Sequence, residues 1–224
     1  MAIYSDLKSL FPVYEMEYFR DSVLITEKSS TAKIKELKWV NSYFQSIDTK
    51  IVKDLTSFFQ GSKAPEVFNW DCDGIIMFEE DGNKYVFLSE LKSSFSSQDL
   101  YHAKDQLISS YIKVNMILHL LPGYRKQDYV FKAFIAILPA KKSYIRDLHK
   151  ELLFNRGSRY KTEAEFTDEL YNSSGRCLTL KATECDKLKE LPLGDNCLFN
   201  ELEFYLIEVP DESSSICLDV HDYI

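Results

Sequence analysis

Charged residues of both signs stand at the ends of two neighbouring apolar segments. Asp73 directly precedes the first segment, whereas Glu90 and Lys92 close the second. Such charges are costly beside a core unless a ligand or a partner uses them. Two carboxylates and a backbone carbonyl, here that of Leu91, are hard oxygen ligands that suit Mg²⁺ with several retained waters, and Mn²⁺ can substitute. A lysine beside such an ion can position a water and offset charge that develops on a phosphate.

The two segments must form a hairpin if these residues are to meet. Gly74–Phe78 and Lys84–Leu91 are rich in β-branched and aromatic residues, and an Asp-Gly pair lies between them. An Asp-Gly pair between such runs is a strong hairpin signal. Side chains alternate along a strand, so Glu90 and Lys92 share one face, above Val86 and Leu88. We therefore expect Asp73, at the start of the first strand, to lie beside them.

The spacing of Glu90 and Lys92 carries no information without this context. An acidic residue two positions before a lysine is expected about three times by chance in a chain of this composition. It occurs four times, at Asp6, Glu36, Asp48 and Glu90. Only Glu90 closes an apolar strand one hairpin away from an Asp-Gly. The alternative interpretation is a surface ion pair, which would contribute little to stability.

A long amphipathic helix follows, from about Ser97 to Leu121, before Pro122-Gly123. Its expected buried stripe consists of Leu100, Ala103, Leu107, Tyr111, Val114 and Leu118. A polar stripe on the same helix contains His102, Gln106, Ser109 and Lys113. Gln106 is a candidate to hold the lysine or to contact a phosphate. A solvent-facing helix surface, with His102 and Lys104 exposed on it, explains the same pattern.

Other elements are expected along the rest of the chain. Apolar residues at spacings of three and four predict a helix over 30–59. Further helices are expected near 142–154, 162–171 and 183–191, and further strands at 129–138, 177–181 and 201–209. This order indicates an α/β architecture with a mixed sheet.

Asp73, a hairpin and then Glu90-Leu91-Lys92 together resemble the PD-(D/E)xK, or restriction-endonuclease-like, nuclease superfamily. The resemblance covers about residues 30–140. It implies a restriction-endonuclease-like mixed sheet flanked by helices, with residues 141–224 as a C-terminal α+β elaboration of a single domain, 1–224. It also implies that Asp73 and Glu90 bind the divalent metal and that Lys92 assists the attacking water.

Three further positions follow from the resemblance. Cys72 stands where a proline often precedes the aspartate, which leaves Asp71 as a competing metal ligand. Some members carry a glutamate on the first helix, and Glu36 is the nearest match. Exonuclease-like members carry a glutamine and a tyrosine on the helix after the motif. Gln106 and Tyr111 are similar to that pair, at an interval of five instead of four.

Charge is unevenly distributed along a chain whose net charge is −8. Residues 92–161 hold thirteen Lys or Arg and five Asp or Glu, whereas 200–224 hold seven acids and no Lys or Arg. The basic segment is either a footprint for phosphates or a surface whose charges mix in three dimensions. Its candidate nucleic-acid contacts are Lys104, Lys113, Lys141, Lys142, Arg146, Arg156 and Arg159. The acidic tail could cover this segment as an autoinhibitor, or its strand at 201–209 could form an oligomer edge.

Several function classes are excluded by what the sequence lacks. Four isolated histidines and five scattered cysteines offer no zinc-ligand spacing, and reduced cysteines are expected. The seven glycines form no phosphate-binding loop. No run of eighteen apolar residues and no signal pattern is present, so we expect a cytoplasmic protein without a membrane partner.

The sequence thus predicts a magnesium-dependent nuclease, with DNA favoured over RNA and an endonuclease over an exonuclease. Small nucleases of this type act in restriction, repair and antiviral defence. A homo-oligomer or an activating protein partner is compatible with this prediction. The alternative is a non-catalytic module on the same fold that binds nucleic acid or protein.

Overall fold

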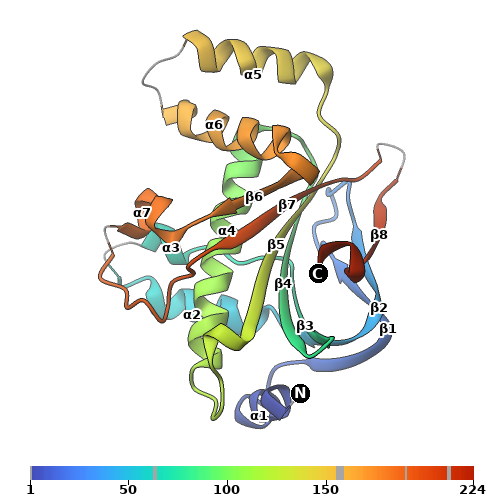
Figure 1. Cartoon of the computed structure of the whole chain (residues 1–224), viewed down its shortest axis with the longest axis vertical. Coiled ribbons are helices and arrows are strands. Elements are labelled where there is room, and N and C mark those ends of the chain that lie inside the picture. Colours follow the sequence, from blue (N-terminus) through green and yellow to red (C-terminus); the bar gives the residue numbers. More distant parts are fainter. Residues whose placement is uncertain (1, 63–64, 155–158, 190, 211–212) are drawn as a thin grey trace.

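The protein is built around one mixed, open sheet of eight strands (Figure 1). The computed structural model describes residues 2–62, 65–154, 159–189, 191–210 and 213–224. Seven strands follow the order β1-β2-β3-β4-β5-β7-β6, and β8 pairs with β2 outside this path. The strands are β1 (Met16–Thr26), β2 (Glu36–Ile47), β3 (Gly74–Glu80), β4 (Asn83–Lys92), β5 (Tyr129–Ile137), β6 (Cys177–Leu180), β7 (Leu202–Glu208) and β8 (Ser215–Asp219). The predicted α/β class with a mixed sheet is confirmed.

Helices pack mainly against one face of this sheet (Figure 1). The α-helices are α1 (Ala2–Leu10), α2 (Lys50–Phe59), α3 (Pro65–Phe68), α4 (Ser97–Leu118), α5 (Lys142–Phe154), α6 (Arg159–Asn172) and α7 (Asp186–Lys189). Short 3₁₀ helices are η1 (Lys126–Asp128), η2 (Ser174–Arg176), η3 (Ala182–Glu184) and η4 (Val220–Tyr223). No helix among the described residues is both long and apolar enough to cross a membrane.

The β3–β4 hairpin forms as the sequence predicts. The antiparallel register runs from Gly74↔Ser89 to Glu80↔Asn83. Asp81 and Gly82 occupy the turn with φ values of +50° and +79°. Positive φ at both central residues is typical of the type I′ turn, whose twist matches that of the flanking strands. The hairpin therefore follows from local turn chemistry.

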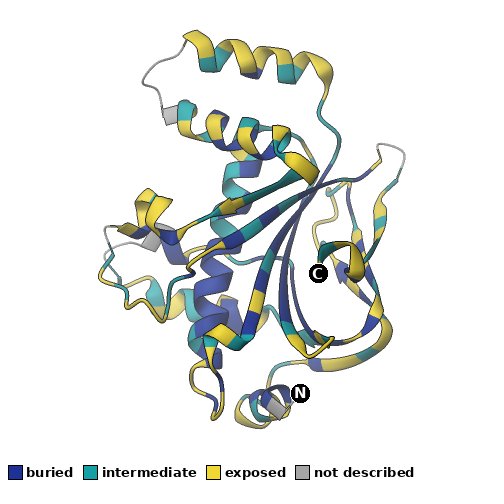
Figure 2. Ribbon diagram, in the orientation of Figure 1, coloured by how far each residue is buried: buried dark blue, intermediate teal, exposed yellow. Residues whose placement is uncertain are grey.

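Helix α4 packs against β4 and β5 and is buried along most of its length (Figure 2). It begins after Ser96, whose side chain accepts a hydrogen bond from the backbone N–H of Asp99 at 3.0 Å. All six residues of the expected apolar stripe are buried. Of the expected polar stripe, Ser109 and Lys113 are also buried, so a solvent-facing surface is wrong for that part of the helix.

The predicted helix over 30–59 is wrong, because residues 36–47 form strand β2 and only 50–59 form a helix. The cause is an irregularity in the strand pair β1–β2. The register shifts between Arg20 and Ser22, and Asp21 and Asn41 have φ values of +67° and +71°. A bulge changes which face the following side chains occupy. The apolar residues on either side of Asn41 are therefore spaced as they would be in a helix.

The second face of the sheet is closed by strands and by the C-terminus instead of helices. Strand β2 pairs through residues 36–40 with β8 and through 45–47 with β3, so it leaves the sheet plane. A second cluster of buried apolar residues lies between these parts of the sheet, and Trp39 within it is fully buried. This second apolar cluster includes Val23, Leu37, Trp39, Phe78, Phe87 and Phe134. Tyr223 of η4 contacts Trp39 and Phe134 edge-on, at ring-centroid distances of 5.5 and 5.2 Å.

The predicted C-terminal elaboration supplies strands to the main sheet. β7 pairs with β5 on one side and with β6 on the other, so it is internal, and the oligomer edge expected at 201–209 is wrong. The end of the expected acidic tail lies in β8 and η4, against the second apolar cluster. The described part of the tail therefore belongs to the sheet and its core, and its Glu203 forms an ion pair with Lys132 at 2.8 Å. Lys141, Lys142 and Arg146 are exposed, which contradicts a cover over those three residues.

Candidate active site

Asp73, Glu90, Lys92 and Gln106 meet where β3 begins and β4 ends, on the face that α4 covers. The backbone N–H of Asp73 donates to the carbonyl of Ser89 at 3.0 Å. Oδ2 of Asp73 accepts a hydrogen bond from the backbone N–H of Leu91, the residue after Glu90, at 2.8 Å. The charge of Asp73 also acts on Glu90 and raises its pKa. The two carboxyl groups therefore lie close together.

Lys92 is held by two acceptors. Its Nζ donates to Oε1 of Glu90 at 2.7 Å and to Oε1 of Gln106 at 2.5 Å. The amide nitrogen of Gln106 donates to the backbone carbonyl of Asp71 at 3.0 Å, which fixes the orientation of the amide. An ammonium group carries three donors. Two are used here, so the third N–H remains for a water or a phosphate oxygen.

Glu90 is an unusual carboxyl group. Its side chain is only 2% exposed, and Oε2 has no hydrogen-bond partner among the described residues. Burial, together with repulsion by Asp73, raises the pKa of Glu90 to about 8 despite the attraction of Lys92. A buried polar atom without a partner is costly, and such atoms in native proteins require an explanation. A cation at this point would supply one.

One carboxylate oxygen of Asp73 is held by the backbone of β4. Oδ2 accepts a hydrogen bond from the backbone N–H of Leu91 at 2.8 Å. Burial raises the pKa of Asp73 to about 6, and the negative charge of Glu27 adds to this more than that of Asp71 does. Glu27 follows β1 and was not identified from the sequence, because 46 residues separate it from Asp73 and no motif links them.

The residues present fit a divalent cation with oxygen ligands. The N–H of Leu91 points to Asp73, and the carbonyl of a strand residue faces the same edge as its N–H. That carbonyl therefore lies on the side where the two carboxyl groups emerge. Within the described ranges no three His, Cys, Asp or Glu side chains cluster as metal ligands. An ion here would thus use two carboxylates, a carbonyl and water, as Mg²⁺ commonly does.

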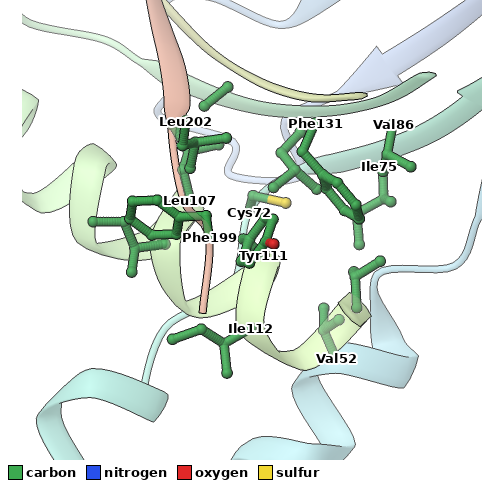
Figure 3. Packing of buried hydrophobic residues seen from close by; sticks show 14 of the residues in the cluster. Val52, Cys72, Ile75, Val86, Leu107, Tyr111, Ile112, Phe131, Phe199 and Leu202 are labelled. Carbon is green, nitrogen blue, oxygen red and sulfur yellow. The ribbon is translucent and has the colours of Figure 1, made fainter. Parts of the chain in front are cut away.

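Two other expected site residues lie elsewhere. Glu36 is on strand β2 and exposed, not on a first helix. Tyr111 is buried between Phe131 and Phe199, at centroid distances of 4.7 and 5.3 Å, and so belongs to the core (Figure 3). Asp71 lies near Asp73, whose pKa its negative charge raises, and its backbone carbonyl accepts a hydrogen bond from Gln106. Its role as a competing metal ligand stays a prediction.

The lysines of α4 are not on the surface, which contradicts their expected contact with nucleic acid. Lys113 is fully buried and donates to Oγ1 of Thr56 at 2.5 Å and to the carbonyl of Trp70 at 2.8 Å. Burial lowers the pKa of Lys113 to about 8. Lys104 is 7% exposed, and its Nζ lies 3.1 Å from Asp105 and 3.3 Å from the ring centre of Tyr101.

The remaining basic candidates lie around α5. Lys141, Lys142 and Arg146 are exposed. Most of α5 has the colour of exposed residues in Figure 2. Helix α5 is tied to the start of α4, because the hydroxyl of Tyr144 accepts a hydrogen bond from the backbone N–H of Ser97 at 2.6 Å. Arg156 lies outside the described residues, and Arg159 begins α6 without a described side chain.

No family model, no curated protein and no solved structure matches this chain.

Proposed function

We propose that the protein is a metal-dependent nuclease that hydrolyses phosphodiester bonds, with DNA as the favoured substrate and an endonuclease favoured. The observation that carries the proposal is the buried carboxyl group of Glu90, which lies near Asp73 and has one oxygen without a hydrogen-bond donor among the described residues. The order of hairpin, Glu90-Leu91-Lys92 and long helix supports membership of the restriction-endonuclease-like superfamily. The exposed cations around α5 support a phosphate-bearing partner.

Each residue has a role that its contacts support. Asp73, Glu90 and the carbonyl of Leu91 would hold the ion. A bound Mg²⁺ or Mn²⁺ would polarise the phosphate and lower the pKa of a water. Lys92 would orient the water or a phosphate oxygen through its third N–H. Gln106 would keep the ammonium group in place, because its amide is itself anchored to Asp71. Phosphoryl transfer depends mainly on such positioning and charge stabilisation.

The first test is cleavage of supercoiled plasmid, linear duplex, single-stranded DNA and RNA in Mg²⁺, Mn²⁺ and EDTA. Wild type should cut at least one substrate in a metal-dependent manner. Lys92→Ala should reduce the rate by about 10²-fold or more, because a positioned catalytic group contributes about 10²–10⁴-fold.

Lys38→Ala is the matched control. Lys38 ends a second Glu-Leu-Lys tripeptide on strand β2, in which Glu36 and Lys38 are exposed and Leu37 is buried. Its removal should leave the rate unchanged. Equal losses in the two variants would contradict the assigned role of Lys92.

If wild type cuts nothing, calorimetric metal binding decides between an enzyme and a non-catalytic module. Binding that Asp73→Ala abolishes would indicate an enzyme that needs an activating partner. Absence of binding would leave Glu90–Lys92 as a structural ion pair and favour the non-catalytic module.

A further inference from the structure

One of the two tryptophans is exposed next to the candidate active site. Trp39 is fully buried in the second apolar cluster, whereas Trp70 is 39% exposed. Trp70 directly precedes Asp71 and lies three residues before Asp73. Three residues span at most about 10 Å. The indole is therefore anchored within reach of a nucleotide that adjoins a phosphate held at Asp73.

Side chains of α4 hold the backbone at Trp70 in place. Its carbonyl accepts a hydrogen bond from the buried Lys113, and the N–H of Cys72 donates to Oγ of Ser110 at 2.9 Å. With the Gln106 contact to Asp71, α4 thus binds each of three consecutive residues, 70–72. The indole is thus attached to a segment of backbone that α4 holds in place.

His102 packs against the same indole. The two rings meet edge to face, with centroids 4.3 Å apart and planes at 86°. His102 stands one helical turn before Gln106 on α4. Burial lowers the pKa of His102, and the positive charge of Lys92 lowers it further, so the neutral imidazole is favoured. A neutral ring supports the indole without itself acting as a phosphate-binding cation.

We propose that Trp70, supported by His102, is a stacking platform for an unpaired nucleobase beside the phosphodiester held at Asp73, Glu90 and Lys92. The proposal rests on the proposed nuclease function and narrows its substrate to single-stranded or frayed nucleic acid. Aromatic side chains stack on bases of any sequence, because each base has a π face. A base within a duplex is already stacked on both faces and becomes available only when it is unpaired or extruded.

Intrinsic fluorescence tests this directly, because Trp70 is the exposed tryptophan and Trp39 is buried. The full chain is titrated with a single-stranded oligodeoxynucleotide, an abasic strand of equal length and a blunt duplex. Ca²⁺, an oxygen-liganded ion, replaces Mg²⁺, and strand integrity is checked on a gel. The strand with bases should quench the emission, whereas the abasic strand should bind by anisotropy without quenching. The duplex should quench least.

Substitutions at Trp70 distinguish a loss of base stacking from a loss of protein stability. Trp70→Ala should weaken binding of the single strand about tenfold, since stacking on one aromatic ring is commonly worth that much. Trp70→Phe should retain most of the affinity, and neither should lower the melting temperature by more than a few degrees. Tyr43→Ala is the control, because Tyr43 is 67% exposed on β2, where it pairs with Arg20 of β1 and not with β3.

The outcomes distinguish this inference from the proposed function. Binding of the single strand without quenching, or equal affinity for Trp70→Ala and wild type, overturns the platform even if cleavage is found. Absence of any binding overturns it too. Quenching that depends on bases, in a protein that neither cuts a substrate nor binds metal, supports the platform and removes the nuclease function.

Discussion

At the scale of single residues, Glu90 determines what this site can do. Its carboxyl group is buried above Val86 and Leu88, with Lys92 on one oxygen and no partner among the described residues on the other. Desolvation penalises the charged form, and the neighbouring Asp73 adds to that penalty. The protein thus keeps a carboxylate where it is unfavourable without a further cation. Functional sites commonly hold groups of this kind.

Metal-free protein should lose stability as the pH rises from about 5 to about 8. The pKa of Glu90 is about 8 in the folded protein and about 4.3 in an unfolded chain, so the folded state binds this proton more tightly. The stabilisation is complete below the unfolded pKa and is lost as the pH rises through the folded pKa, by at most about 1.4 kcal/mol per pH unit. The pKa of Asp73 is about 6, so this residue also makes stability fall with rising pH, over a lower pH range.

Urea unfolding in EDTA at several pH values measures this dependence. Glu90→Gln removes the ionisable group and should flatten the profile. Added Mg²⁺ should stabilise wild type more at pH 8 than at pH 5, because the carboxylates must lose their protons to bind it. If the free energy of unfolding changed equally with pH in wild type and in Glu90→Gln, the raised pKa of Glu90 would be contradicted.

At the scale of elements, α4 connects the site to the segment before β3. Three of its side chains, those of Gln106, Ser110 and Lys113, hydrogen-bond the backbone of Asp71, Cys72 and Trp70, respectively. The sequence pattern identified a polar stripe on α4 but could not distinguish a solvated stripe from one that receives a loop. The periodicity of a helix shows which side chains share a face. It does not show which distant segment packs against that face.

Helix α5 should supply the electrostatic part of nucleic-acid binding. Changing Lys141, Lys142 and Arg146 together to Glu should weaken binding of duplex and single-stranded DNA alike. If each contacts one phosphate, the slope of log K against log salt should become shallower by about 2–3, as counterion release predicts. The measurement is anisotropy at several salt concentrations, with catalytic residues unchanged.

A charge-matched control places the same change elsewhere. Lys38, Lys53 and Lys181 are exposed on or beside β2, α2 and β6. Changing these three to Glu alters net charge equally and should preserve most of the salt slope. Equal slopes in the two triple variants would show that overall charge, not α5, governs binding.

At the scale of the whole molecule, the chain closes its sheet with its own C-terminus. β8 runs parallel to β2, and η4 sets Tyr223 against Trp39 and Phe134. Acidic residues in this segment, such as Asp219, face outward while Val220 is fully buried. The acidic composition of the tail thus describes its solvent side, whereas its buried residues complete a core.

Tyr223→Ala should therefore destabilise the protein by about 2 kcal/mol, below the range for a fully buried aromatic because Tyr223 is half-buried. Affinity for nucleic acid should stay unchanged at temperatures where the variant is folded. Thermal unfolding and anisotropy measure the two quantities, and His221→Ala, on an exposed neighbour, is the control. Tighter DNA binding by Tyr223→Ala would restore the hypothesis that the tail is an autoinhibitor.

The sequence by itself determined the elements that depend on local interactions. The Asp81-Gly82 turn, the strands beside it and the capped helix α4 all involve residues close together in the chain. The meeting of Asp73 with Glu90 and Lys92 follows from the same hairpin register. Turn chemistry and side-chain alternation are sufficient for these features, because no distant segment is needed to choose between alternatives.

Only the tertiary structure decided the features that need a distant partner. Residues 36–47 became a strand because β1, β3 and β8 pair with them, although a bulge gives them helix-like spacing. Lys113 is buried because Thr56 and Trp70 offer acceptors from other elements. The pairing of Trp70 with His102 has the same origin. Long-range packing overrides local propensity at such positions, because burial and hydrogen bonding outweigh the small intrinsic preferences of single residues.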